Sequence, residues 1–139
     1  MTDQFNLKRF IDAQDSVYEA ARSELLQGQK SSHWMWFIFP QIAGLGHSFM
    51  AEKYAISSLD EARAYVAHPL LGPRLKDCTQ IVIEIENRPI HQIFGHPDAL
   101  KFRSSMTLFA HAAPEESVFR QALTKYFNSE SDPLTVERL

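Results

Sequence analysis

Apolar residues recur at spacings of three and four along most of this chain, which is the pattern of helices with one buried face. The first run covers residues 10–25 and includes Phe10, Val17, Tyr18 and Leu25. Gly28 follows this run at the place where a left-handed C-terminal cap belongs. The pattern therefore predicts one helix over residues 10–25.

The segment 69–87 carries two competing patterns. Apolar residues from Leu71 onward repeat at three and four, whereas the alternation of Ile81, Ile83 and Ile85 is typical of an edge strand. No other segment has a similar density of β-branched residues, and an isolated strand cannot satisfy its backbone hydrogen bonds. We therefore predict a long helix over 69–87.

Capping residues divide much of the chain into short helices. Ser58 and Glu61 have the spacing of a capping box, and Asp132 precedes Pro133 as an N-cap. Prolines at positions 89, 97 and 114 lie where further helices can begin, because proline is tolerated at the first helical position. We predict a single all-α domain over residues 1–139 with seven to eight helices, several of them short.

The composition is that of a globular domain, and the net charge argues against a nucleic-acid partner. Of the 139 residues, 45% are hydrophobic and 22% are charged. A chain of this size buries about two thirds of its unfolded surface. The net charge of -3 leaves no excess of Lys and Arg for a phosphate backbone, so we expect no nucleic-acid partner. A local basic pocket for a small anion is compatible with this charge.

The sequence predicts a soluble, cytoplasmic protein without a membrane partner. Its first ten residues lack the apolar stretch of a secretion signal, and its longest apolar run falls far short of the roughly 20 residues that cross a bilayer. Cys78 is the one cysteine, which excludes an intramolecular disulfide. We expect Cys78 to be a small buried helix residue rather than a nucleophile, because no neighbouring group is evident that would lower its pKa.

The six histidines show none of the spacings typical of zinc sites. No two of them lie four residues apart on a predicted helix, and cysteine pairs are missing. The sequence therefore predicts no metal ion and no cofactor.

The most unusual segment is 30–48, which has the sequence KSSHWMWFIFPQIAGLGHS. It contains both tryptophans of the chain, Trp34 and Trp36, which face different directions on a helix because they are two residues apart. We expect one of them to face a cavity and the other to pack in the core. The alternative is that both are core anchors, as tryptophan usually is.

Several motifs resemble those of the DUF1810 family, a family named for its unknown function. They are KSSHWMWFIFPQ at 30–41, GLG at 44–46, HPLLGPRL at 68–75, FG at 94–95, PD at 97–98, Lys101 and SSMTLF at 104–109. The resemblance covers nearly the whole chain. It implies a small, mainly helical bacterial cytosolic domain and no established reaction.

Candidate site residues in the unusual segment are polar groups beside the aromatic rings. His33 is either a general base or a donor to a backbone carbonyl at a helix start, and the second role is the commoner one. Lys30 and Gln41 lie in the same segment and are candidate ligand contacts.

The turn that follows offers a second group of candidates. Gly44 and Gly46 allow a ligand to approach the backbone closely, and Ser48 begins a helix whose N-terminal amides can bind phosphate. The turn lacks the glycine patterns of nucleotide-binding loops, so a helix N-cap by Ser48 is the simpler interpretation.

A third group lies further along the chain. Asp98, Lys101 and Ser105 share one helical face, where Asp98 is a candidate catalytic group and the other two are candidate ligand contacts. Asp98 and Lys101 can equally form an exposed ion pair. Arg74 is a candidate phosphate contact, or it pairs with Glu61 or Asp77 on the surface.

Two functions follow from these residues. The first is a domain that binds a phosphate-bearing or nucleotide-like metabolite, and as a hydrolase it would use His33 or Asp98 for acid-base work. It requires His33, Arg74, Lys101 and one tryptophan to meet at one cavity. The second is a non-enzymatic protein-protein interaction module in which these residues are scattered. The sequence does not decide whether the protein is an enzyme, nor its oligomeric state.

Overall fold

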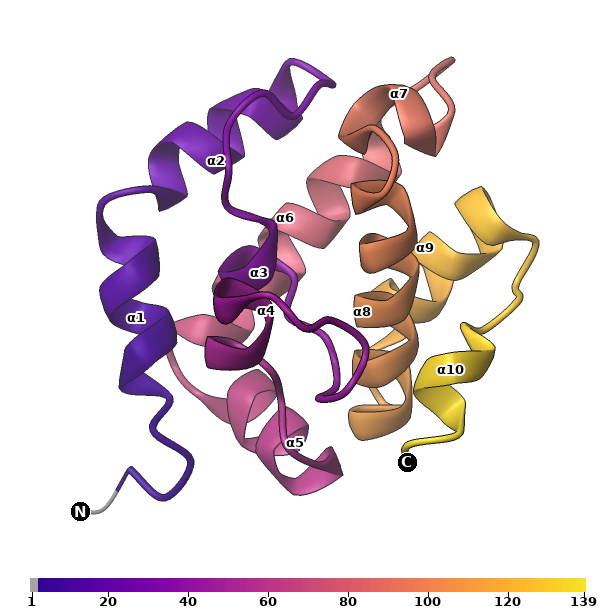
Figure 1. Cartoon of the computed structure of the whole chain (residues 1–139). Helices are drawn as coiled ribbons and strands as arrows, with labels where there is room; N and C mark the ends of the chain where they lie inside the picture. Colours follow the sequence, from indigo (N-terminus) through magenta and orange to yellow (C-terminus); the bar gives the residue numbers. More distant parts are fainter. Residues whose placement is uncertain (1–2) are drawn as a thin grey trace.

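The computed structural model describes residues 3–139, so residues 1 and 2, with which the predicted domain begins, lie outside the described residues. Helices joined by turns and by two longer loops, before and after α3 (Met35–Ile38), make up this part of the chain (Figure 1). The prediction of an all-α fold is confirmed, because residues 3–139 contain one isolated β-bridge, between Ile42 and Ile56, and no strand. The helices are α1 (Lys8–Asp15), α2 (Tyr18–Leu26), α3 (Met35–Ile38), α4 (Phe49–Lys53), α5 (Leu59–Ala67), α6 (Leu71–Glu84), α7 (Ile90–Phe94), α8 (Asp98–Ala112), α9 (Ser117–Phe127) and α10 (Pro133–Val136).

The predicted number of seven to eight helices is wrong, because the described residues form ten. The run predicted as one helix over 10–25 is broken between α1 and α2, where Val17 leaves the helical region with a φ of -121°. The apolar spacing continues across this break and neither Gly nor Pro marks it, so the sequence pattern gives no signal of it. Gly28 has the predicted left-handed conformation, with a φ of 81°.

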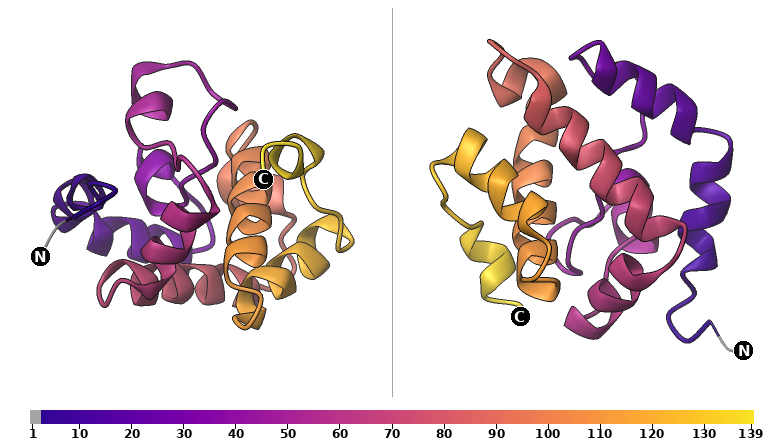
Figure 2. Two further views of the ribbon diagram at one scale, coloured as in Figure 1. Left: turned by 90° about the horizontal axis from the view of Figure 1, so that it is seen from below. Right: turned by 180° about the vertical axis from the view of Figure 1, so that it is seen from behind.

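The helix predicted over 69–87 is α6, and the strand alternative is excluded. Ile81 and Val82 are buried and Ile83 is half-buried, so three consecutive residues of α6 are covered by neighbouring elements. Ile85 follows the helix as its C-cap. Helix α6 packs against α2, α5 and α9. Seen from behind, it crosses the molecule between the N-terminal helices and the pair α8 and α9 (Figure 2).

Three predicted caps are present. The hydroxyl of Ser48 accepts a hydrogen bond from the amide of Ala51 at 3.1 Å, and that of Ser58 accepts from the amide of Glu61 at 3.2 Å. The carboxylate of Asp132 accepts from the amide of Thr135 at 3.2 Å. Each side chain satisfies a backbone donor that the first helical turn leaves unpaired.

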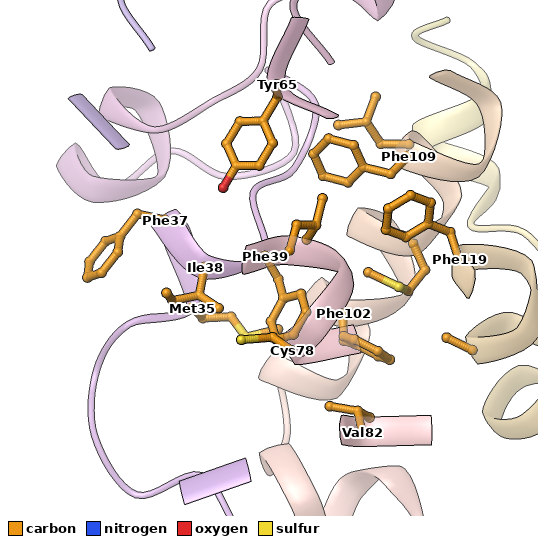
Figure 3. Packing of buried hydrophobic residues seen from close by; sticks show 14 of the residues in the cluster. Met35, Phe37, Ile38, Phe39, Tyr65, Cys78, Val82, Phe102, Phe109 and Phe119 are labelled. Atoms are coloured by element: carbon orange, nitrogen blue, oxygen red, sulfur yellow. The ribbon is translucent and has the colours of Figure 1, made fainter. Parts of the chain in front are cut away.

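The core is rich in aromatic rings that join α3 to α7 and α8. The ring of Phe39, which directly follows α3, lies next to that of Phe102, with 5.0 Å between their centroids (Figure 3). Its centroid also lies 5.8 Å from that of Phe94. Trp34 packs edge-on against Phe94 at 6.4 Å. These contacts hold the segment 34–39 against the start of α8, which is where the candidate site lies.

None of the helices in the described part of the chain is long and apolar enough to span a membrane.

Candidate functional site

The C-terminal end of α2, helix α7 and the first turns of α8 lie at the same end of the molecule, at the top of Figure 1. Glu24 on α2 fixes the backbone that leads from α2 into α3. Its carboxylate accepts hydrogen bonds from the amides of Ser31 and Ser32, from the Ser32 hydroxyl, and from Nε1 of Trp34. One carboxylate therefore positions the start of the 30–48 segment.

These hydrogen bonds determine the charge state of Glu24. Burial alone would raise the pKa of this carboxyl group, but the bonds from the Ser32 hydroxyl, the two serine amides and the Trp34 indole outweigh burial. Together they lower the pKa of Glu24 to about 2. Glu24 is therefore a structural anion at neutral pH. Its role could not be predicted, because an acidic residue on a helix carries no distinctive sequence pattern.

Lys30 is the central residue of the site. Its ammonium lies 2.9 Å from Oδ2 of Asp98 and 5.1 Å from the ring centroid of Trp34, and its side chain is 8% exposed. Its backbone amide donates to the carbonyl of Ile93 at 2.7 Å. A lysine this buried is held in place by its carboxylate and by the face of an aromatic ring.

Asp98 is shared between two lysines. Its other oxygen, Oδ1, lies 3.5 Å from Nζ of Lys101, and the Lys101 ammonium lies 5.6 Å from the ring centroid of Trp36. The cluster of Lys30, Asp98 and Lys101 thus carries two positive charges and one negative charge. We call these three residues, with the rings of Trp34 and Trp36, the lysine cluster.

A pocket of about 410 Å³ borders the lysine cluster at Lys30. Arg88 and His91 also line it, and none of its lining residues in the described part of the chain is acidic. Its volume lies within the range of roughly 300–1,000 Å³ typical of small-molecule sites. The remaining lining residues are Gln29, Gln92, Ile93, Phe94 and Gly95.

The two tryptophans differ in burial. Trp34 is fully buried. Its indole N–H donates to Glu24, and the Lys30 ammonium lies over its ring. Trp36 is half-buried and lies beside Lys101. Trp34 is therefore an anchor of the core, and Trp36 is the one of the two that retains exposed ring surface.

Arg74 lies in different surroundings from the lysine cluster. Its guanidinium lies 3.5 Å from Asp15, 3.3 Å from Oε1 of Gln14, and 4.8 Å from the ring centroid of Tyr18, all on α1 and α2. Its ion-pair partner is thus Asp15, rather than Glu61 or Asp77 as the sequence suggested. The contacts of Arg74 are those of a residue that joins α6 to the N-terminal helices.

The residues of the 41–48 turn have local structural roles. The carbonyl of Gln41 accepts from the amide of Ile56 at 2.8 Å. Gly44 has a φ of 97°, and a Cβ atom there would lie 2.3 Å from Nη1 of Arg138. At Gly46, a Cβ atom would lie 2.8 Å from that of Ala51. The close approach that these glycines allow is made by side chains of the same chain.

Two further candidates differ sharply in exposure. His33 is exposed, next to the buried Trp34. Ser105 is fully buried on α8, one turn after Lys101, and its hydroxyl has no hydrogen-bond partner among residues 3–139. Cys78 is buried as predicted, and burial raises the pKa of its thiol to about 12.

Residues 3–139 contain no group of three or more His, Cys, Asp or Glu side chains that could hold a metal ion. The site offers the ammonium groups of Lys30 and Lys101, the guanidinium of Arg88 and the indole ring of Trp36.

Comparison with known proteins identifies the family. A family model described as a protein of unknown function, DUF1810, matches residues 4–139. The chain belongs to the DUF1810 family. This confirms the resemblance seen in the motifs of the sequence.

A solved structure of similar sequence supports the same fold. The crystal structure of the conserved hypothetical protein Rv1873 from Mycobacterium tuberculosis has a TM-score of 0.97 and 52% sequence identity to this DUF1810 protein. The match covers 99% of this chain and 98% of that chain. No curated protein matches the chain.

Proposed function

We propose that this protein binds a small phosphate-bearing metabolite in the pocket beside Lys30. The observation that carries the proposal is the excess of basic over acidic side chains at this pocket and in the lysine cluster beside it. Lys30 and Lys101 share one carboxylate, and Arg88 and His91 line the pocket without an acidic neighbour in its lining. Charged hydrogen bonds from Lys and Arg are the usual way in which proteins hold phosphate oxygens.

The lysine cluster prepares Lys30 for this role. Because Asp98 and the Trp34 ring hold the Lys30 ammonium, a ligand meets a cation whose position is already fixed. A fixed side chain loses less conformational entropy on binding than a free surface lysine does. The pocket therefore favours binding more than the overall charge of -3 would indicate.

A nucleotide-like ligand would use Trp36 in addition. The half-buried ring of Trp36 lies next to the Lys101 ammonium, so a base stacked on the ring would place its phosphate near a cation. Stacking of a base on an aromatic side chain contributes about 1–3 kcal/mol. In this proposal Gln41, Gly44, Gly46, Ser48, Arg74 and Ser105 shape the fold and do not contact the ligand.

Hydrolysis of such a ligand, with His33 or Asp98 for the acid-base work, remains a prediction. Both oxygens of Asp98 face ammonium groups, so in the proposal Asp98 positions the lysines. His33 is the exposed residue nearest in sequence to the aromatic rings and is the candidate general base.

Two observations favour the alternative of a protein-protein interaction module. Arg74 lies apart from the lysine cluster, so the four residues that ligand binding was expected to bring to one cavity do not all meet. Most of the aromatic segment is core, as that alternative requires, and the ring of Phe49 on α4 is 75% exposed. A single exposed ring is a small part of an interface, because stable interfaces bury about 800 Å² on each partner. The surplus of charge at Lys30 therefore supports ligand binding more strongly.

A thermal-shift measurement tests the proposal. Inorganic phosphate, ribose 5-phosphate, AMP, NAD and ADP-ribose are added to the purified protein in turn. A ligand at 100 times its Kd adds about 2.7 kcal/mol of stability, which raises the Tm of a domain of this size by roughly 8 °C. We expect at least one phosphate compound to raise the Tm.

Matched variants locate the binding. Arg88→Gln removes a cation from the pocket and should reduce the shift, whereas Arg63→Gln removes an exposed arginine on α5 and should leave it unchanged. Equal shifts in the two variants, or no shift with any phosphate compound, would contradict the proposal.

Tryptophan fluorescence separates nucleotides from simple phosphates. A base on Trp36 should quench the wild-type emission, and Trp36→Phe should abolish the quenching because it leaves only the buried Trp34. Quenching that persists in Trp36→Phe would place the base elsewhere.

A further inference from the structure

A second pocket lies at the opposite end of α8 from Asp98. It has a volume of about 470 Å³ and is formed where the last turns of α8 meet α9 and the turn after α9. Figure 1 shows α9 and α10 on the other side of α8 from α3. Its lining residues are Ala110, His111, Pro114, Arg120, Leu123, Thr124, Ser129 and Ser131.

Arg120 supplies the charge of this pocket. One of its terminal nitrogens donates to the carbonyl of Pro114 at 2.5 Å, which orients the guanidinium. Within residues 3–139 Arg120 forms no ion pair. The remaining N–H groups of an oriented guanidinium can donate to both oxygens of a carboxylate.

Hydroxyl groups add hydrogen-bonding capacity. The side-chain oxygens of Thr124 and Ser129 lie 2.9 Å apart, so one hydroxyl donates to the other and the second proton is left for a ligand. Ser131 lines the same pocket with a third hydroxyl.

The remaining lining is apolar except for one imidazole. Ala110 and Leu123 are buried, and Pro114 lines the pocket together with them. Nδ1 of His111 lies 2.9 Å from the carbonyl of Thr107, which can only accept, so Nδ1 carries the proton of this bond. The other ring nitrogen of a neutral His111 is then an acceptor.

From this combination we infer that the second pocket binds a small organic carboxylate with an apolar body. Arg120 holds the carboxylate, and Ala110, Pro114 and Leu123 contact the body. A pocket with one basic side chain and several apolar lining residues should bind an apolar carboxylate better than it binds phosphate. Phosphate is more strongly hydrated and gains little from contact with apolar surface. The pocket beside Lys30 is more polar, because Lys30 and Arg88 are both basic and Gln29 and Gln92 add side-chain amides.

The test is an NMR titration of the amide signals of the isotope-labelled protein with three probes. Benzoate carries the carboxylate and the apolar ring, benzyl alcohol carries the ring without the charge, and inorganic phosphate carries charge without the ring. We expect benzoate to shift the signals of residues 110–111, 123–124 and 129–131, and to bind about tenfold or more tightly than benzyl alcohol. Phosphate should leave these signals unchanged.

Variants at the two pockets show whether Arg120 binds the carboxylate of benzoate. Arg120→Gln should weaken benzoate binding about tenfold or more, and Arg120→Lys, which keeps the charge but loses the fork of the guanidinium, should weaken it less. Arg88→Gln is the matched control and should leave benzoate binding unchanged. The inference is overturned if benzoate shifts no signal of the pocket, if benzyl alcohol binds equally well, or if Arg120→Gln binds benzoate like the wild type.

Discussion

Two clusters in this protein contain carboxylates, basic side chains and an aromatic ring. They differ in the number of carboxylates for each basic side chain. In the lysine cluster, Asp98 is the one carboxylate among residues 3–139 that forms an ion pair with Lys30 and Lys101. In the second cluster, which we call the arginine cluster, Arg22 pairs with Asp77 at 2.7 Å and Arg74 pairs with Asp15 at 3.5 Å. Each arginine therefore has its own carboxylate, whereas the two lysines share one.

The clusters also differ in burial. The side chains of Arg22 and Asp77 are 39% and 41% exposed, whereas that of Lys30 is 8% exposed. Tyr18 completes the arginine cluster, since its hydroxyl donates to Asp77 at 3.0 Å, and burial together with its charged neighbours raises the pKa of this phenol.

A balanced and exposed cluster joins helices, and solvent screens its charges. An unbalanced cluster beside a pocket retains a charge that a ligand can neutralise. This difference, rather than the number of basic residues, separates the candidate site from the ordinary surface of the protein.

The largest expected effect comes from removing the shared carboxylate. Asp98→Asn leaves the Lys30 ammonium buried without its partner, which should lower the free energy of unfolding by about 3 kcal/mol. Urea denaturation of the variant and the wild type measures the change.

A double-mutant cycle provides the control for Asp98. In a Lys30→Met background the buried charge is gone, so Asp98→Asn should cost about 1 kcal/mol or less. Additive costs of the two substitutions would show that Lys30 does not depend on Asp98.

A smaller effect is expected at the anchor of the same segment. Glu24→Gln replaces a carboxylate that accepts four hydrogen bonds with an amide that has one accepting oxygen, and should cost about 2 kcal/mol. Glu24→Ala, which removes both oxygens, should also make Trp34 more accessible to acrylamide quenching, because the indole then loses its acceptor.

The pH dependence of stability identifies the role of Glu24. Its pKa is lowered from 4.5 to about 2 in the folded protein, so its contribution is fully present above pH 4.5 and is lost as the pH falls from 4.5 through 2. The difference in unfolding free energy between wild type and Glu24→Gln should shrink over this interval. A difference that is constant from pH 6 to pH 2.5 would contradict the hydrogen-bonded anion.

The smallest effects are expected in the arginine cluster. Arg22→Gln and Arg74→Gln each remove one member of a partly exposed pair and should change the free energy of unfolding by less than about 1 kcal/mol. Neither should change the thermal shift caused by a phosphate compound. A loss of that shift in Arg74→Gln would restore Arg74 as a ligand contact and remove the distinction between the two clusters.

Much of the fold could be predicted from local sequence signals. Ser48, Ser58 and Asp132 cap helices, as their residue types and spacings indicate. The segment after Leu71 is a helix, as its apolar spacing indicates, despite the alternating isoleucines. The break before Tyr18 was missed because the apolar spacing continues through it, although α1 packs against α3 and α2 packs against α6. Helices of four or five residues, such as α3 and α7, are too short to show a period.

The candidate site was predictable only in its parts. Lys30, Trp36, Asp98 and Lys101 were singled out for their chemistry, and the structure brings them together. Their meeting depends on aromatic packing between α3 and α8, which no local pattern records. Arg88 was missed for the same reason, since its place in the pocket follows from the position of α7.

Lys30 also links the proposed binding site to the folding kinetics of the protein. The contacts of this residue with Ile93 and Asp98 join segments far apart in the chain, and such contacts form late because long loops must close first. The pocket therefore exists only after the N-terminal helices and α7 have docked. A ligand bound there would prolong the lifetime of the folded state by slowing unfolding, and would leave the rate of folding almost unchanged.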